Sequence, residues 1–133
     1  MSLHEGDELD PRDFTMTRGD LVRYAGASGD FNPIHWSDRV ATSVGLPGVI
    51  AHGMYTFALA SRAVAGWVGD PSDIVSVSAR FTKPVVVPDD ETGATLRVAG
   101  RVSSVEEGLA TIELTVMHEA QKVLGMASAV VRC

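Results

Sequence analysis

The sequence has only one cysteine, few aromatic residues and no long hydrophobic run. The cysteine is the last residue, Cys133, so an internal disulfide and a zinc-binding cysteine cluster are both excluded, which suits a reducing compartment. The apolar stretches are shorter than the roughly 20 residues of a membrane helix. The start, MSLHEGDELD, is polar where a secretory signal would be apolar. We therefore expect a cytoplasmic protein without a membrane partner.

Positive charge is also scarce. The chain has 11 Lys and Arg residues against 17 Asp and Glu residues, a net charge of -6. Because its basic residues are scattered, the chain lacks the basic face that nucleic acid requires. Its 133 residues, 45% of them hydrophobic, suffice for one core and are too few for two. We see no repeat and no linker, and we expect a single domain over residues 1–133.

The N-terminal half has helical patterns. Thr17 to Asp20 resembles a capping box, which predicts a helix to about Ala27. The segment SGDFNPIH is a loop, because Pro33 holds the preceding residue extended, and a short helix capped at Ser37 or Asp38 then ends near Gly45. The segment GMYTFALASRAVAGWV, residues 53–68, is apolar around nearly its whole circumference, which predicts a buried helix of about four turns.

After Pro71 the apolar residues recur with a period of two. This alternation predicts strands over residues 75–82, 96–102, 110–116 and 123–131, with a weakly marked strand near 13–16. The first of these strands places Val75, Val77, Ala79 and Phe81 on its apolar face. One long apolar helix followed by such strands predicts an α+β hot-dog fold, an antiparallel sheet wrapped around that helix. Free strand edges then favour a homodimer with one continuous sheet.

Asp30 and His35 are the first candidates for chemistry, because both lie in the loop SGDFNPIH. A carboxylate and an imidazole differ in intrinsic pKa, so the two can share acid and base roles on one water molecule. Spacing alone favours a plainer interpretation, in which Asp30 forms a turn and His35 bonds to the loop. One His and one Asp are too few ligands for a metal site, so we expect no metal.

A second candidate lies where the long helix begins, in the segment AHGM. The first amides of a helix have no internal acceptor, so the Gly53 N–H can stabilise a developing oxyanion. An equally good interpretation is that Gly53 only relieves crowding. Ser61 lies two turns further along roughly the same face and is a candidate substrate contact, whereas Thr56 is expected to bond back to its own helix.

The segments YAGASGDFNPIHWSD and PGVIAHGM resemble the MaoC-like hydratase/dehydratase family, which includes (R)-specific enoyl-CoA hydratases. The resemblance covers nearly the whole chain and implies a hot-dog fold, usually dimeric. It also implies that Asp30 and His35 hold the catalytic water and that the Gly53 amide binds the thioester carbonyl. Ser61 matches a serine found in some members, and Asn32 is a further candidate substrate contact.

The implied reaction is hydration of trans-2-enoyl thioesters, or dehydration of (3R)-hydroxyacyl thioesters, with coenzyme A or acyl carrier protein (ACP) as carrier and without a cofactor. YAGASGDFNPIHWSD and WVGDP look especially like catalytic subunits of mycobacterial (3R)-hydroxyacyl-ACP dehydratases, so a heterodimer with a related subunit is an alternative. Two other functions stay open. A hot-dog thioesterase leaves Asp30 and His35 unexplained, and a non-catalytic acyl-binding subunit is expected to lack one of the pair.

Overall fold

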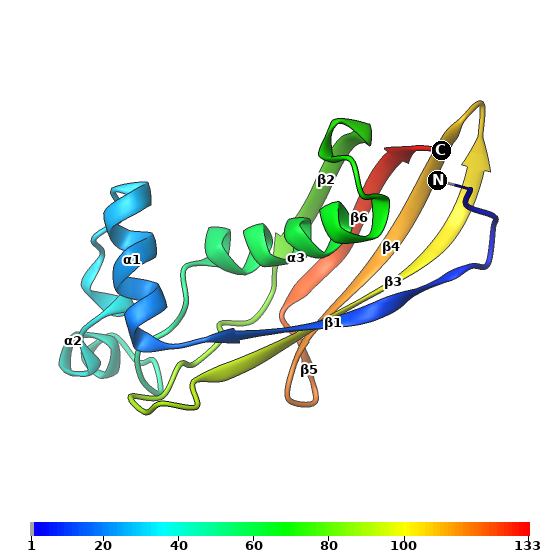
Figure 1. The fold of residues 1–133 in the computed structure, drawn as a ribbon. Coiled ribbons are helices and arrows are strands. Elements are labelled where there is room, and N and C mark those ends of the chain that lie inside the picture. Colours follow the sequence, from blue (N-terminus) through cyan, green and yellow to red (C-terminus); the bar gives the residue numbers. More distant parts are fainter. Residues whose placement is uncertain (1) are drawn as a thin grey trace.

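The computed structural model describes residues 2–133 as a curved antiparallel sheet that cradles one long helix (Figure 1). The sheet order is β1-β3-β4-β6-β2, and β5 pairs with β4 outside this path. The strands are β1 (Glu8–Met16), β2 (Ile74–Phe81), β3 (Ala94–Glu106), β4 (Leu109–His118), β5 (Gln121–Lys122) and β6 (Leu124–Arg132). This arrangement confirms the predicted hot-dog fold.

The long helix, α3 (Gly53–Val68), has the predicted bounds and packs on the concave face of the sheet. Its buried face includes Leu59, Ala63, Val64 and Trp67, and its opposite face is open, with Met54 55% exposed. The sequence predicted burial on all sides. One sheet can cover only one side of a helix, so the remaining apolar surface of α3 is uncovered in the single chain.

Two shorter helices stand at one end of the sheet, opposite the end that holds both termini (Figure 1). Helix α1 (Arg18–Ser28) begins with the predicted capping box between Thr17 and Asp20. Helix α2 (Asp38–Ser43) begins at the predicted cap Ser37, and a 3₁₀ turn, η1 (Pro33–His35), lies in the loop before it. A second 3₁₀ turn, η2 (Pro71–Asp73), follows α3.

Strands β3 and β4 alternate as the sequence predicts. Leu96, Val98 and Val102 on β3, and Ile112 and Val116 on β4, are fully buried between the sheet and α3. Alternate residues of β3, such as Thr95 and Arg97, face solvent. No helix within residues 2–133 is long and apolar enough to span a membrane.

The two edge strands differ from their predicted patterns. Strand β1 begins at Glu8 rather than near Asp13, and its pairing with β3 shifts between Leu9 and Arg12, around Pro11. Edge strands tolerate proline and bulges, and this irregularity removes the regular alternation that marks a strand in a sequence. The weakly marked pattern near residues 13–16 therefore predicted only the end of β1.

Strand β2, at the other edge, keeps the predicted inward face only in its middle. Ile74, Val77 and Ala79 pack against the core, whereas Val75 is 48% and Phe81 58% exposed. The pairing of β2 with β6 shifts between Ile74 and Ser76 and again between Ser78 and Arg80. Each shift rotates the following side chains to the other face, so strict alternation fails at both ends of the strand.

Candidate active site

The loop after α1 holds the Asp30 carboxylate by one oxygen only. Gly29 ends α1 with a left-handed conformation, φ 78°, and the Asp30 N–H donates to the Ser28 hydroxyl at 3.2 Å. Asp30 Oδ1 accepts the Asn32 N–H at 3.1 Å. The predicted turn role of Asp30 is therefore real, and Oδ2 remains free to face His35.

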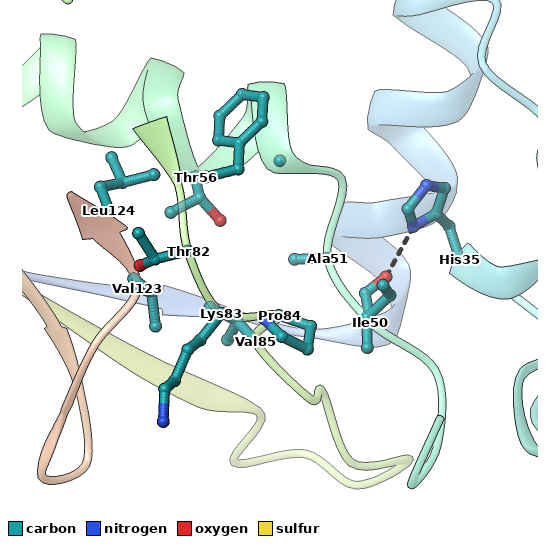
Figure 2. A pocket seen from close by; sticks show the side chains of 12 residues that line it. His35, Ile50, Ala51, Thr56, Thr82, Lys83, Pro84, Val85, Val123 and Leu124 are labelled. Atoms are coloured by element: carbon teal, nitrogen blue, oxygen red, sulfur yellow. Dashed lines mark hydrogen bonds between the residues drawn. The ribbon is translucent and has the colours of Figure 1, made fainter. Parts of the chain in front are cut away.

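His35 points its Nε2 at that free oxygen. The side chain is largely buried, and Nδ1 lies 2.8 Å from the Ile50 carbonyl oxygen (Figure 2). A carbonyl only accepts, so Nδ1 carries the proton and Nε2 of the neutral ring has a lone pair. Nε2 and Asp30 Oδ2 are 3.9 Å apart, too far for a direct hydrogen bond. One water oxygen between these two atoms would be within hydrogen-bond reach of both.

The segment that binds His35 is itself fixed from α1 and α2. Asp38 Oδ1 accepts the Val49 N–H at 3.1 Å and an Arg18 N–H at 2.9 Å. Arg18 also donates from Nε to the Val87 carbonyl at 2.6 Å. These bonds hold the chain immediately before Ile50, and they thereby fix the carbonyl to which His35 donates.

The same bonds make stability depend on pH. The Val49 N–H, followed by the Arg18 guanidinium, lowers the pKa of Asp38. A carboxyl group with a lowered folded-state pKa stabilises the fold fully above its ordinary value of about 3.9, and this stabilisation is lost as the pH falls through the lowered value. Asp38→Asn keeps an acceptor for Val49 but lacks the charge.

We therefore expect the Asp38→Asn variant to be less stable than wild type at neutral pH, and the difference to shrink as the pH falls below about 4. Urea unfolding from pH 7 to pH 2.5 measures this difference. Asp89→Asn is the control, because Asp89 is an exposed aspartate. An Asp38→Asn difference that does not change with pH contradicts the expectation.

Gly53 begins α3 beside this pair. The residue before it, His52, makes no side-chain capping bond, so no side chain there accepts the first amides of the helix. Gly53 and Phe81 line two hollows of about 310 Å³ each, of which one contains His35 and the other Asp30. A Cβ at position 53 would lie 3.2 Å from the Phe81 ring. Glycine therefore leaves room for both the ring and a substrate.

The hollow with His35 is mainly apolar. Figure 2 shows its wall, which consists of Ile50, Ala51, Pro84, Val85, Val123 and Leu124. Thr56 and Thr82 add hydroxyl groups, and Lys83 lies on the rim with its side chain extending away from the cavity. An apolar cavity with a few polar groups at one end suits a ligand with a polar head and a hydrocarbon tail.

Thr56 and Ser61 of α3 have different surroundings. Thr56 was expected to bond back to its helix, but it lines the cavity one turn after Gly53. The Ser61 hydroxyl instead donates to the Phe57 carbonyl at 3.0 Å, and Ser61 lines neither hollow. Asn32 uses its Oδ1 to accept the Ile34 N–H at 3.2 Å. Substrate contacts by Ser61 and Asn32 stay predictions.

His52 completes a cluster of three metal-ligating side chains, with Asp30 and His35, in which one ligand atom of each lies within 4.8 Å of the others. However, the rings of His35 and His52 are stacked, with centroids 3.8 Å apart and planes at 21°. Imidazole lone pairs lie in the plane of the ring, so those of two stacked rings run side by side and do not converge on one ion. This donor set does not fit a metal.

Several residues of the site were missed by sequence reasoning. The spacing of Thr56 from Gly53, three residues on a helix, was a usable signal, because such residues share a face. His52 was noted only as part of the segment before α3. Phe81 and Thr82 carried no signal, because they enter the site only through the position of β2 beside α3.

Comparison with known proteins identifies the family of the chain. Residues 3–122 match the sequence family described as "MaoC like domain". The chain is 42% identical over 73 residues, 55% of its length, to 3-hydroxyacyl-thioester dehydratase X of Mycobacterium tuberculosis. That stretch is 25% of the relative, so the chain spans much less than the full length of the curated relatives it matches.

Two solved structures show the fold. A structure described as a MaoC-like dehydratase has a TM-score of 0.94 and 36% identity over 98% of this chain and 40% of that one. The R-hydratase of Pseudomonas aeruginosa has a TM-score of 0.82 and 26% identity, over 98% of this chain and 82% of that one. Both confirm the architecture predicted from the sequence.

Proposed function

This chain belongs to the MaoC-like domain family, and we propose that it adds water to trans-2-enoyl thioesters and removes it from (3R)-hydroxyacyl thioesters. The observation that carries the proposal is the pair formed by Asp30 Oδ2 and His35 Nε2, 3.9 Å apart beside the first amide of α3. The names of the relatives, a 3-hydroxyacyl-thioester dehydratase and an R-hydratase, support the same reaction class.

In the hydration direction, one water lies between Asp30 and His35. His35 Nε2 takes a proton as the water oxygen bonds to C3, and the C2–C3 electrons move toward the thioester carbonyl. The Gly53 N–H stabilises the resulting enolate oxygen. The proton on His35 then passes to C2, so one water molecule is added in total. Asp30 orients the water and stabilises the imidazolium, because its charge lies close to that ring.

The apolar wall of the cavity favours an acyl chain as the substrate tail, with the thioester near Gly53. Coenzyme A and ACP both present the acyl group on a phosphate-bearing pantetheine arm. Lys83, on the rim and pointing outward, is placed to meet such a phosphate. Either carrier is therefore part of the proposal, with the carrier chemistry located outside the cavity.

The uncovered edge of the sheet supports a dimer, either of two copies or with a related subunit. Strand β2 ends the sheet order, and its neighbourhood exposes Val75, Phe81 and Met126. The open apolar face of α3 lies on the same molecule without a covering layer. A partner that extends the sheet at β2 would cover these side chains. A cytoplasmic location is part of the same proposal.

The test is to mix the purified protein with a short trans-2-enoyl-CoA and follow the loss of the enoyl absorbance, then to determine the chirality of the product. Formation of the (3R)-hydroxyacyl thioester supports the proposal. Release of free thiol instead identifies a thioesterase. The third outcome is that a preparation shown by sedimentation to be folded does not react with CoA or ACP substrates. This result indicates a subunit that needs a different partner or only binds acyl groups.

A further inference from the structure

His52 is the most buried titratable side chain of the site, with 2% of its surface exposed against 7% for His35. It directly precedes α3, and helix caps of this kind are usually Ser, Thr, Asp or Asn, whose side chains accept helix amides. His52 makes no such bond. Its side chain turns away from the helix and into the site.

The ring of His52 contacts both Asp30 and His35. One face stacks on the His35 ring, with a centroid distance of 3.8 Å and planes at 21°. The edge places Nε2 3.1 Å from the Asp30 carbonyl oxygen. Tyr24 of α1 packs against the same ring at 4.8 Å, tilted by 58°, and Tyr55 of α3 packs on Tyr24. His52 is therefore held between the helices and the catalytic loop.

These contacts define the protonation of His52. The Asp30 carbonyl only accepts, so Nε2 carries the proton. Nδ1 is buried and has no hydrogen-bond partner among the residues that the structure describes. A second proton, on Nδ1, would create a buried cation with an unpaired donor. Burial lowers the pKa of His52, and a positive charge on His35 would lower it further, against the opposing effect of Asp30.

We infer that His52 is a positioning residue, which holds Asp30 by its backbone and His35 by its ring and stays neutral while His35 changes charge. Two stacked imidazoles cannot easily both be charged, because like charges at this distance repel. Burial assigns the neutral state to His52 and leaves the proton exchange to His35, which faces the Asp30 carboxylate. The expected effect on kcat rests on the proposed function. The protonation state of His52 does not depend on that function.

The kinetic test compares two substitutions that each remove one contact. His52→Phe keeps a stacked ring and loses the bond to Asp30, whereas His52→Gln keeps a donor and loses the stack. We expect each to lower kcat by about tenfold to a hundredfold, with KM within about threefold, because small displacements of reacting groups cost this much. His118→Phe is the control, since His118 also bonds to a backbone carbonyl, of Thr95, outside the site.

A double-variant cycle separates positioning from a general effect on the fold. If His52 acts through His35, the loss caused by His52→Phe should largely disappear in a His35→Gln background. A loss of kcat of the same size in both backgrounds overturns the inference. An unchanged kcat in folded His52→Phe or in folded His52→Gln overturns it as well.

The protonation state is tested without any activity. Nitrogen-15 NMR of the histidine rings, recorded between about pH 5 and pH 8, should show His52 as the neutral Nε2–H tautomer throughout. His52→Phe identifies the resonances of His52. Protonation of His52 at both nitrogens within this range overturns the inference. A protein that lacks activity but shows the expected tautomer contradicts the proposed function alone.

Discussion

Asp30→Asn and His35→Gln will each lower kcat for enoyl-thioester hydration by about two to four orders of magnitude. Asp30→Asn retains the oxygen that accepts the Asn32 N–H, so the loop keeps its turn and only the charge facing His35 is lost. His35→Gln removes the group that takes the water proton. Initial rates at saturating substrate, with circular dichroism as the check on folding, measure both effects.

Two remote residues give matched controls. Asp70 has the same local role as Asp30, since its Oδ1 accepts the Ser72 N–H at 2.9 Å. His118 accompanies it as the control for His35, because its Nδ1 lies 3.0 Å from a carbonyl oxygen of Thr95. We expect Asp70→Asn and His118→Gln to keep kcat within about twofold, as for surface changes remote from the site.

The combined Asp30→Asn/His35→Gln variant should lose little more than the more damaging single variant. Groups that act together on one water give strongly non-additive losses, because either substitution already disables the step. Two independent, multiplying losses would show that the residues act in different steps. A folded single variant that keeps more than about a tenth of kcat would remove that residue from the mechanism.

Gly53→Pro will lower kcat by about a hundredfold to a thousandfold, which is the usual cost of losing one donor to an oxyanion. Proline deletes the amide hydrogen and is well tolerated at the first position of a helix. The preceding residue, His52, has φ -59° and ψ 132°, a conformation that proline permits in its neighbour. The substitution therefore removes the proposed donor while preserving the start of α3.

Gly53→Ala is the control for added bulk. It keeps the amide hydrogen but places a Cβ 3.2 Å from the Phe81 ring, which must move slightly. We expect its kcat to fall by less than about tenfold. Equal losses in the alanine and proline variants would assign the effect to crowding at Phe81, and wild-type kcat in a folded proline variant would exclude the Gly53 amide as the oxyanion donor.

The sequence predicted those features that local periodicity encodes. The bounds of α3 were correct because sixteen consecutive residues, Gly53–Val68, share one helical pattern. Strands β3 and β4 were correct because both lie inside the sheet, where burial on one face enforces alternation. The capping residues Thr17 and Ser37 were also recognisable locally.

Features that depend on contacts between distant segments were not predictable in this way. The inward face of β2 depends on how its bulges pair with β6, and the stack of His35 on His52 joins residues from two separate loops. The different roles of Thr56 and Ser61 depend on which side of α3 faces the β2–β3 connection. In each case the local pattern fits two outcomes, and the tertiary arrangement selects one.

The cavity draws its reactive groups and most of its wall from different parts of the chain. Asp30 and His35 lie before α3, whereas Val85, Val123 and Leu124 come from the segments that follow it. Mutational drift in the later segments can therefore reshape the space for an acyl tail without altering the atoms that handle water. Directed evolution of chain-length preference would accordingly begin with libraries at those three positions, with the loop before α3 kept unchanged.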